Sequence, residues 1–147
     1  MLRSVRKYLR NSKSWRKKMT RRSGRLIRKL KRRGLSDRDI LDFFIYDNLI
    51  HSEKRFCPLF ASGQKCHIFS ADRLNCLGCY CPYFELTVEE KGSEIECGSC
   101  SVNSPAAQRF SSDGKVKILD CSMCVIPHQA STAMKVLRSY QDSSSRD

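Results

Sequence analysis

Thiol side chains are concentrated in the middle of this 147-residue sequence, from position 57 to position 124. Six of the nine cysteines form three C-x2-C pairs: Cys76 and Cys79, Cys97 and Cys100, and Cys121 and Cys124. Two sulfurs at this spacing can bind one tetrahedral ion at about 2.3 Å each, because the turn between them directs both side chains inward. The pattern predicts metal-binding knuckles, and the odd number of cysteines argues against a disulfide framework.

The set of candidate metal ligands is larger than one ion needs. It comprises all nine cysteines and two of the three histidines: Cys57, Cys66, Cys76, Cys79, Cys81, Cys97, Cys100, Cys121, Cys124, His67 and His128. Eleven donors favour two four-coordinate zinc ions. Four thiolates also hold an iron–sulfur cluster, which is therefore the alternative cofactor.

The order of these thiol motifs resembles that of the cysteine-rich small domain of bacteria and archaea. The motifs that carry the resemblance are "CPLF" at Cys57, "CHIF" at Cys66, "NCLGCYCPYF" from Asn75 and "DCSMCVIPH" ending at His128. The resemblance covers residues 57–128 and implies a metal-binding fold. The motif positions that it implies are Cys57, Cys66, Cys76, Cys79, Cys81, Cys97, Cys121, Cys124, His67 and His128. The chain departs from the family at "CGSC", where Cys100 adds a thiol to the usual C-G-G turn, and in a longer gap before Cys66.

No acid–base or nucleophile pattern accompanies the thiols. The HExxH, Walker and zinc deaminase signatures are missing from the sequence. A zinc site rich in thiolate is negatively charged, which favours a closed structural site over a catalytic one. We therefore expect a binding protein rather than an enzyme. The alternative is a redox or corrinoid-related metalloprotein with an iron–sulfur cluster or an open zinc, since the family that the chain resembles occurs in some genomes near corrinoid-synthesis genes.

A strongly basic segment forms the first quarter of the chain. Residues 1–34 hold sixteen Lys and Arg and no acid, so the whole net charge of +13 comes from this segment. We predict a partly helical arm, interrupted near Asn11 and Gly24, that binds the phosphate backbone of a nucleic acid, RNA in particular. An anionic membrane surface is the alternative partner. The cations assigned to this contact are Arg6, Lys7, Arg10, Arg16, Lys17, Lys18, Arg21, Arg22, Arg25, Arg28, Lys29, Arg32 and Arg33.

Residues 35–54 predict one capped, apolar helix. Ser36 is a good N-cap residue, and Asp39 lies three residues later as in a capping box. Apolar residues follow on more than one face. We therefore expect this helix to dock on the cysteine-rich module, or to bind a protein partner or a second copy of the chain through residues 36–50.

The expected fold is a small, metal-stabilised α+β protein in which a cysteine-rich module with short strands and knuckles follows helical segments. The module covers residues 55–140, with strands in "YCPYFELTV" and "KVKILDCSMC", a loop over residues 101–114, and a last helix that opens at Ser131 or Thr132. Residues 141–147 are expected to form a disordered tail. The sequence lacks a secretory signal and an apolar run of membrane-spanning length, so we expect a cytoplasmic protein.

Overall fold

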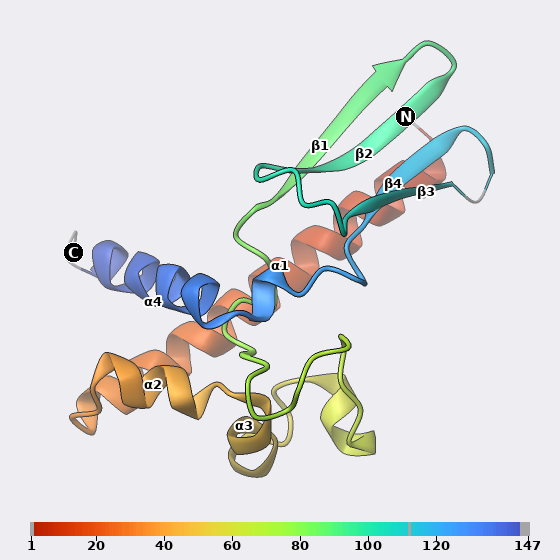
Figure 1. Cartoon of the computed structure of the whole chain (residues 1–147). Helices are drawn as coiled ribbons and strands as arrows, with labels where there is room; N and C mark the ends of the chain where they lie inside the picture. Colours follow the sequence, from red (N-terminus) through yellow and green to blue (C-terminus); the bar gives the residue numbers. More distant parts are fainter. Residues whose placement is uncertain (1, 112, 145–147) are drawn as a thin grey trace. The chain divides into compact units, whose positions relative to one another are not determined.

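The computed structural model describes residues 2–111 and 113–144, which form an α+β fold (Figure 1). The helices are α1 (Arg3–Arg32), α2 (Asp37–Phe43), α3 (Tyr46–Ser52) and α4 (Ala130–Ser144), with short 3₁₀ helices η1 (Pro58–Ser62) and η2 (Ile126–His128). The strands are β1 (Phe84–Lys91), β2 (Glu94–Cys100), β3 (Gln108–Ser111) and β4 (Val116–Asp120). The chain divides into two compact units: the strand unit, residues 1–17 with 83–124, and the helical unit, residues 18–82 with the segment from 125 onward.

The strand unit contains a four-stranded sheet in the order β1-β2-β4-β3. β1 and β2 pair as an antiparallel hairpin, and β3 pairs antiparallel with β4. β2 and β4 are parallel, with Cys97 opposite Ile118. The carboxyl ends of these two central strands therefore lie at the same edge of the sheet, which is the edge where both strands lead into cysteines.

The core of the strand unit lies between the sheet and the first turns of α1. Val5, Cys97 and Val116 are almost completely buried there, and Tyr8 and Leu9 pack against them. The prediction of strands before and after the loop region is confirmed by β1 and β4. The predicted loop over residues 101–114 is wrong in part, because β3 forms within it by pairing with β4.

Helix α1 is continuous, so the predicted interruptions near Asn11 and Gly24 are wrong. Gly24 is a packing position: a Cβ atom placed there would lie 3.2 Å from Cε1 of Tyr140. The Tyr140 hydroxyl donates a hydrogen bond to the Thr20 carbonyl at 2.9 Å. The lack of a side chain at Gly24 therefore lets α4 approach α1 closely within the helical unit.

The apolar stripe of α1 is part of the protein core. Its buried members are Val5, Met19, Leu26, Ile27 and Leu30. The segment that the sequence predicted as a basic arm is consequently a structural helix that contributes residues to both compact units.

The single helix predicted after Ser36 is two helices, α2 and α3. The predicted capping box is confirmed, since the Ser36 side chain accepts from the Asp39 amide and the Asp39 side chain accepts from the Ser36 amide. The break occurs at Phe44 and Ile45, where the backbone bonds to a distant segment instead of continuing the helix. The Cys76 amide donates to the Phe44 carbonyl and the Tyr46 amide donates to the Leu74 carbonyl, both at 2.8 Å.

The core of the helical unit gathers the apolar residues of these helices. Ile40, Phe44 and Leu49 are completely buried, together with Leu74, Leu77, Ala133 and Leu137. An edge-on aromatic contact joins Phe44 to Phe56, and another joins Tyr46 to Phe60. The main apolar side chains proposed for a partner or dimer contact through residues 36–50 are thus used inside the unit.

The last helix runs farther than predicted. α4 continues to Ser144, and the Gln141 side chain donates to Asp37 at 2.8 Å. The predicted disorder is therefore wrong for residues 141–144, while residues 145–147 lie outside the described part of the chain. Within the described ranges, no helix combines the length and the apolar character needed to cross a bilayer.

Candidate metal centre

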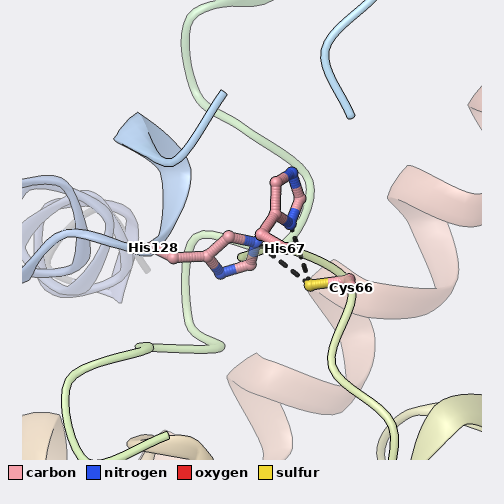
Figure 2. Close-up of side chains that lie close together, drawn as sticks. All are labelled: Cys66, His67 and His128. Carbon is pink, nitrogen blue, oxygen red and sulfur yellow. Dashed lines mark hydrogen bonds between the residues drawn. The ribbon is translucent and has the colours of Figure 1, made fainter. Parts of the chain in front are cut away.

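Three predicted ligands from separate parts of the helical unit meet in one place (Figure 2). Cys66 and His67 lie in the segment after η1, and His128 is the last residue of η2. Cys66 Sγ is 3.0 Å from Nδ1 of His67 and 3.4 Å from Nε2 of His128. Within residues 2–111 and 113–144, this is the one group of three Cys, His, Asp or Glu donors that all lie within 4.8 Å of one another.

The ring of His128 is held in the orientation that metal binding requires. Its Nδ1 lies 2.8 Å from the backbone carbonyl oxygen of Asn75, which can accept only a hydrogen bond. Nδ1 therefore carries the proton, and the lone pair of Nε2 faces Cys66. Burial is the main cause that lowers the pKa of His128 to about 4, so the imidazole is neutral at pH 7. Such a second hydrogen bond on a ligating histidine fixes the ring and its tautomer.

Asn75 is itself fixed by four contacts with neighbouring segments. Its amide donates to the His128 carbonyl at 3.0 Å, and its side chain donates to the Leu41 carbonyl at 2.8 Å. Its Oδ1 accepts from the Leu77 amide at 3.0 Å. Asn75 also forms an isolated bridge with Ile45. These contacts make Asn75 a positioning residue for His128, a role that we did not assign from the sequence although Asn75 begins the "NCLGCYCPYF" motif.

The turn that carries Cys76 and Cys79 packs directly on η2. The Cys79 amide donates to the Cys76 carbonyl at 3.2 Å, which closes the turn. A Cβ atom at Gly78 would lie 2.1 Å from the carbonyl oxygen of Pro127, a distance that real Cβ atoms do not show. Gly78 is therefore needed for the close approach that places this turn beside His128.

Three further thiols of the helical unit are linked electrostatically to Cys66: Cys57 and Cys76 interact with it directly, and Cys79 acts on Cys76. Burial raises the pKa of Cys76 well above its ordinary value, and the charges of Cys79, Cys66 and Cys57 raise it further. Burial, followed by the charge of Cys57, also raises the pKa of Cys66. Four sulfurs and two imidazoles in one region suit zinc, which prefers such donors. Cys81 follows the turn with a positive φ of 31°, and its amide donates to the Gly78 carbonyl at 2.8 Å.

The remaining four cysteines belong to the strand unit. Cys97 and Cys100 lie in β2, and Cys121 and Cys124 follow β4. The Cys124 amide donates to the Cys121 carbonyl at 2.9 Å, so this pair forms a turn, as Cys76 and Cys79 do. The predicted knuckle at Cys97 and Cys100 is different, because the pair lies in a strand that bends at Gly98, where φ is +80°.

The cations predicted to contact nucleic acid fall into two groups: those that are exposed to solvent and those that already bond to backbone carbonyls of the protein. Arg16 donates to the Phe84 carbonyl and Arg22 to the Phe56 carbonyl, both at 2.7 Å and both partly buried. These two guanidinium groups therefore have structural partners in the fold. The other thirteen Lys and Arg of α1 are solvent-exposed, and so is Arg33, the residue after the helix, which gives fourteen exposed cations. Among them, Lys31 pairs with Asp37 and Lys29 with Glu53.

A groove in the helical unit lies beside several of these cations. It has a volume of about 710 Å³ and its lining includes Arg28, Lys31, Arg32 and Tyr140. Ile27 and Gly24 contribute to its apolar floor. An aromatic ring beside several cations is the combination that holds single-stranded nucleic acid, through base stacking and phosphate contacts.

Comparison of the chain with protein-family models, with curated proteins and with solved structures finds no match.

Proposed function

We propose that this is a zinc-binding protein that uses the exposed cations of α1 to bind RNA. The observation that carries the proposal is the division of α1 between an apolar face, buried in the fold, and fourteen exposed Lys and Arg at or beside its other faces. Burial of the apolar face holds the helix in place and leaves the charged side chains of its other faces exposed to solvent. Cations at fixed positions bind a phosphate backbone by releasing its counterions.

The metal part of the proposal rests on the Cys66, His67 and His128 group. Its donors are one sulfur and two imidazole nitrogens, and His128 has the outer hydrogen bond expected of a ligating ring. One of Cys57, Cys76 and Cys79 would complete a four-coordinate site. The resemblance of residues 57–128 to the cysteine-rich small domain stays a prediction, since no family model matches the chain. Zinc would act here as a structural staple for a chain with a small apolar core.

Single-stranded RNA is the partner that the groove beside α1 favours. Arg28 and Arg32 would contact phosphates, and the ring of Tyr140 would stack on a base. Lys31 is partly neutralised by Asp37, so we expect a smaller contribution from it. Phosphate contacts alone carry no sequence information, and we therefore expect little base specificity.

The experiment is fluorescence anisotropy of a labelled single-stranded RNA with the full-length zinc-loaded protein over a range of salt. Replacing Arg21, Arg25, Arg28 and Arg32 with glutamine should reduce the negative slope of log affinity against log salt by about 3, from about 0.7 for each lost contact. The matched control replaces Lys54, Lys65, Lys115 and Lys135, which are exposed cations outside α1. The same loss of slope in both variants would show that net charge, rather than α1, binds RNA.

Two further arms separate the alternative partners. If the protein binds anionic vesicles more tightly than RNA at the same salt concentration, the partner of α1 is a membrane surface rather than RNA. Tyr140→Leu should weaken binding of single-stranded RNA more than binding of duplex RNA, because only unpaired bases can stack on the ring. Equal losses of affinity for single-stranded and duplex RNA would show that the groove is not part of the RNA-binding site.

An open zinc is the second candidate function, and one observation favours it. Among the residues that the structure describes, only three donors meet within 4.8 Å, and Cys66 is an exposed residue. Three protein ligands with a fourth position for water is the arrangement of catalytic zinc sites. Cobalt substitution tests this candidate, since added azide would change the visible spectrum of an open site and leave that of a closed site unchanged.

A further inference from the structure

The strand unit holds a second group of thiols that does not share residues with the Cys66 group. Cys97 and Cys100 are separated from Cys121 and Cys124 by 20 residues, so the pattern is C-x2-C-x20-C-x2-C. This spacing is typical of zinc sites in which two pairs of cysteines hold one ion. The question is whether the fold brings the two pairs together.

Sheet topology places both pairs at one edge. β2 and β4 are parallel neighbours with Cys97 opposite Ile118, and Cys121 directly follows β4. Because parallel strands run in the same direction, Cys100 at the end of β2 and Cys121 after β4 leave the sheet on the same side. Strand pairing thus brings the two cysteine pairs to the same end of the sheet although they are far apart in sequence.

Ser104 links one member of each pair. Its amide donates to Cys100 Sγ at 3.5 Å, and its hydroxyl lies 3.2 Å from Cys124 Sγ. Ser104 is buried, as is Cys124. Two sulfurs from different pairs therefore contact the same buried residue, whose N–H and O–H groups can donate to thiolates.

Cys97, a member of the first pair, lies near Tyr8 of α1. The ring of Tyr8 packs against the buried cluster that contains Cys97 in the core of the unit. A Cβ atom at Gly98 would lie 2.8 Å from the Tyr8 hydroxyl. The hydroxyl is buried and makes no hydrogen bond of normal geometry among the described residues, although the Ser12 side chain acts on it. This buried donor would gain an acceptor if the neighbouring Cys97 thiol became a thiolate.

Positive charge is also supplied at this edge. Four thiolates around Zn²⁺ leave a net charge of about −2, which a buried site must offset. Arg109 of β3 donates to the Gly98 carbonyl at 3.0 Å, between Cys97 and Cys100 in sequence. Its guanidinium also pairs with Glu96 at 3.4 Å, so it offsets only part of that charge.

We infer that Cys97, Cys100, Cys121 and Cys124 form a second zinc site, with four sulfur ligands and with Tyr8, Ser104 and Arg109 around it. The inference goes beyond the proposed function, because neither RNA binding nor the histidine-containing site requires it. No three of these sulfurs are within 4.8 Å of one another, so binding has to draw them to the separation of about 3.8 Å that 2.3 Å bonds impose. Cys121 and Cys124 are in a turn at a strand end, where such a movement is easiest.

The test uses full-length protein loaded with cadmium-113, because the NMR shift of this ion reports how many sulfurs bind it. We expect two resonances in the wild-type protein, one typical of four sulfurs and one at the lower shift of a mixed sulfur and nitrogen site. Cys100→Ser should shift or remove only the four-sulfur resonance and reduce bound zinc from two ions to one. Cys66→Ser should affect only the other resonance, so the two sites fail or survive separately.

Met123→Ala is the matched control, since its side chain lies in the Cys121–Cys124 turn and is 65% exposed. It should retain both resonances and both zinc ions. The wild-type spectrum needs no variant to fold, so absence of a four-sulfur resonance in protein that carries the mixed resonance would overturn the inference. Loss of both resonances in Cys100→Ser with an intact wild-type pattern, in protein that keeps its helical circular dichroism, would show one shared site and would overturn it as well.

Discussion

At the scale of single residues, Asn75 connects the His128 ring to the body of the helical unit. Its backbone carbonyl accepts a hydrogen bond from Nδ1, and its side chain donates to the Leu41 carbonyl and accepts from the Leu77 amide. Asn75→Ala keeps the backbone carbonyl that accepts from His128 but removes the two side-chain bonds that hold this carbonyl in place, so zinc binding should weaken by about 10-fold, the lower end of the range for losing a ligand's hydrogen-bond partner. It should also lower the free energy of unfolding by about 1 to 3 kcal/mol, since buried polar groups lose their partners. Chelator competition and urea unfolding measure the two effects.

Asn48→Ala is the control for that substitution. The Asn48 side chain donates to the Asp42 carbonyl at 2.7 Å but is exposed, so water can replace the lost bond. It should leave zinc affinity unchanged. Equal losses of affinity in both variants would contradict the positioning role of Asn75.

Gly78 is a second residue at which a single substitution should have a large effect on stability. Gly78→Ala should destabilise the protein strongly and weaken zinc binding, because its Cβ would collide with the Pro127 carbonyl and move η2. Gly63→Ala is the comparison: Gly63 has a φ of +64° and open space around it, so the cost is only the left-handed backbone, about 1 to 2 kcal/mol. Thermal melts of the zinc-loaded variants give both values. A smaller effect at position 78 than at position 63 would be incompatible with the contact.

The titration of the ligands predicts how metal binding depends on pH. Burial raises the pKa of Cys76 and of Cys66, so in the metal-free protein protons occupy these thiols at and above pH 7. Thiols bind metal as thiolates, and zinc affinity should therefore rise with pH and fall as the solution is acidified. His128 has a pKa lowered to about 4 and should not contribute to the change above pH 5. Competition with a fluorescent zinc chelator from pH 5 to 8 checks the sign; a flat profile would exclude thiolate ligands.

The sequence predicted the members of the site better than their arrangement. Cys66, His67 and His128 were all expected as ligands, and the structure brings them together across 62 residues of chain. Spacing along the chain could not pair them, because the contact depends on Gly78 packing against η2. The roles of Asn75 and Ser104 were missed for the same reason, since a hydrogen bond to a distant residue leaves no local pattern.

At the scale of secondary structure, α1 combines a core face with a charged face. Met19 is completely buried, whereas the neighbouring Lys18 is exposed. Met19→Ala should lower the free energy of unfolding by about 2 to 5 kcal/mol, the cost of a cavity in a packed core. Lys18→Ala should change it by less than about 0.5 kcal/mol. Chemical denaturation of the two variants distinguishes a structural helix from a detachable arm, for which both changes would be small.

The elements that the sequence predicted are those with strong local signals. The capping box at Ser36 and Asp39 marks the start of α2, and alternating residues around Val116 mark β4. The continuity of α1 through Gly24 was not predictable, because a glycine that breaks one helix permits close packing in another. The break between α2 and α3 likewise comes from hydrogen bonds to residues 74–76, which overrule the local helical pattern.

At the scale of the whole molecule, metal and RNA binding should be linked through folding. Each compact unit has a small apolar core, and a bound ion supplies stability that such a core lacks. Removal of zinc by a chelator under reducing conditions should lower the melting temperature and weaken RNA binding together, and added zinc should restore both. Circular dichroism melts and RNA anisotropy on the same samples measure this. Full RNA affinity in protein that has lost its zinc and its fold would separate the two functions.

The exposure of Cys66 has a consequence for how the proposed zinc site would be loaded. His128 is buried and already oriented, while Cys66 is an exposed residue whose sulfur lies at the outer side of the group. An ion would therefore bind first to Cys66 at the surface and then to the buried imidazole of His128, without global unfolding of the protein. Loading and exchange are then governed by a local step, so the occupancy of this centre can follow the supply of metal during the lifetime of the folded chain.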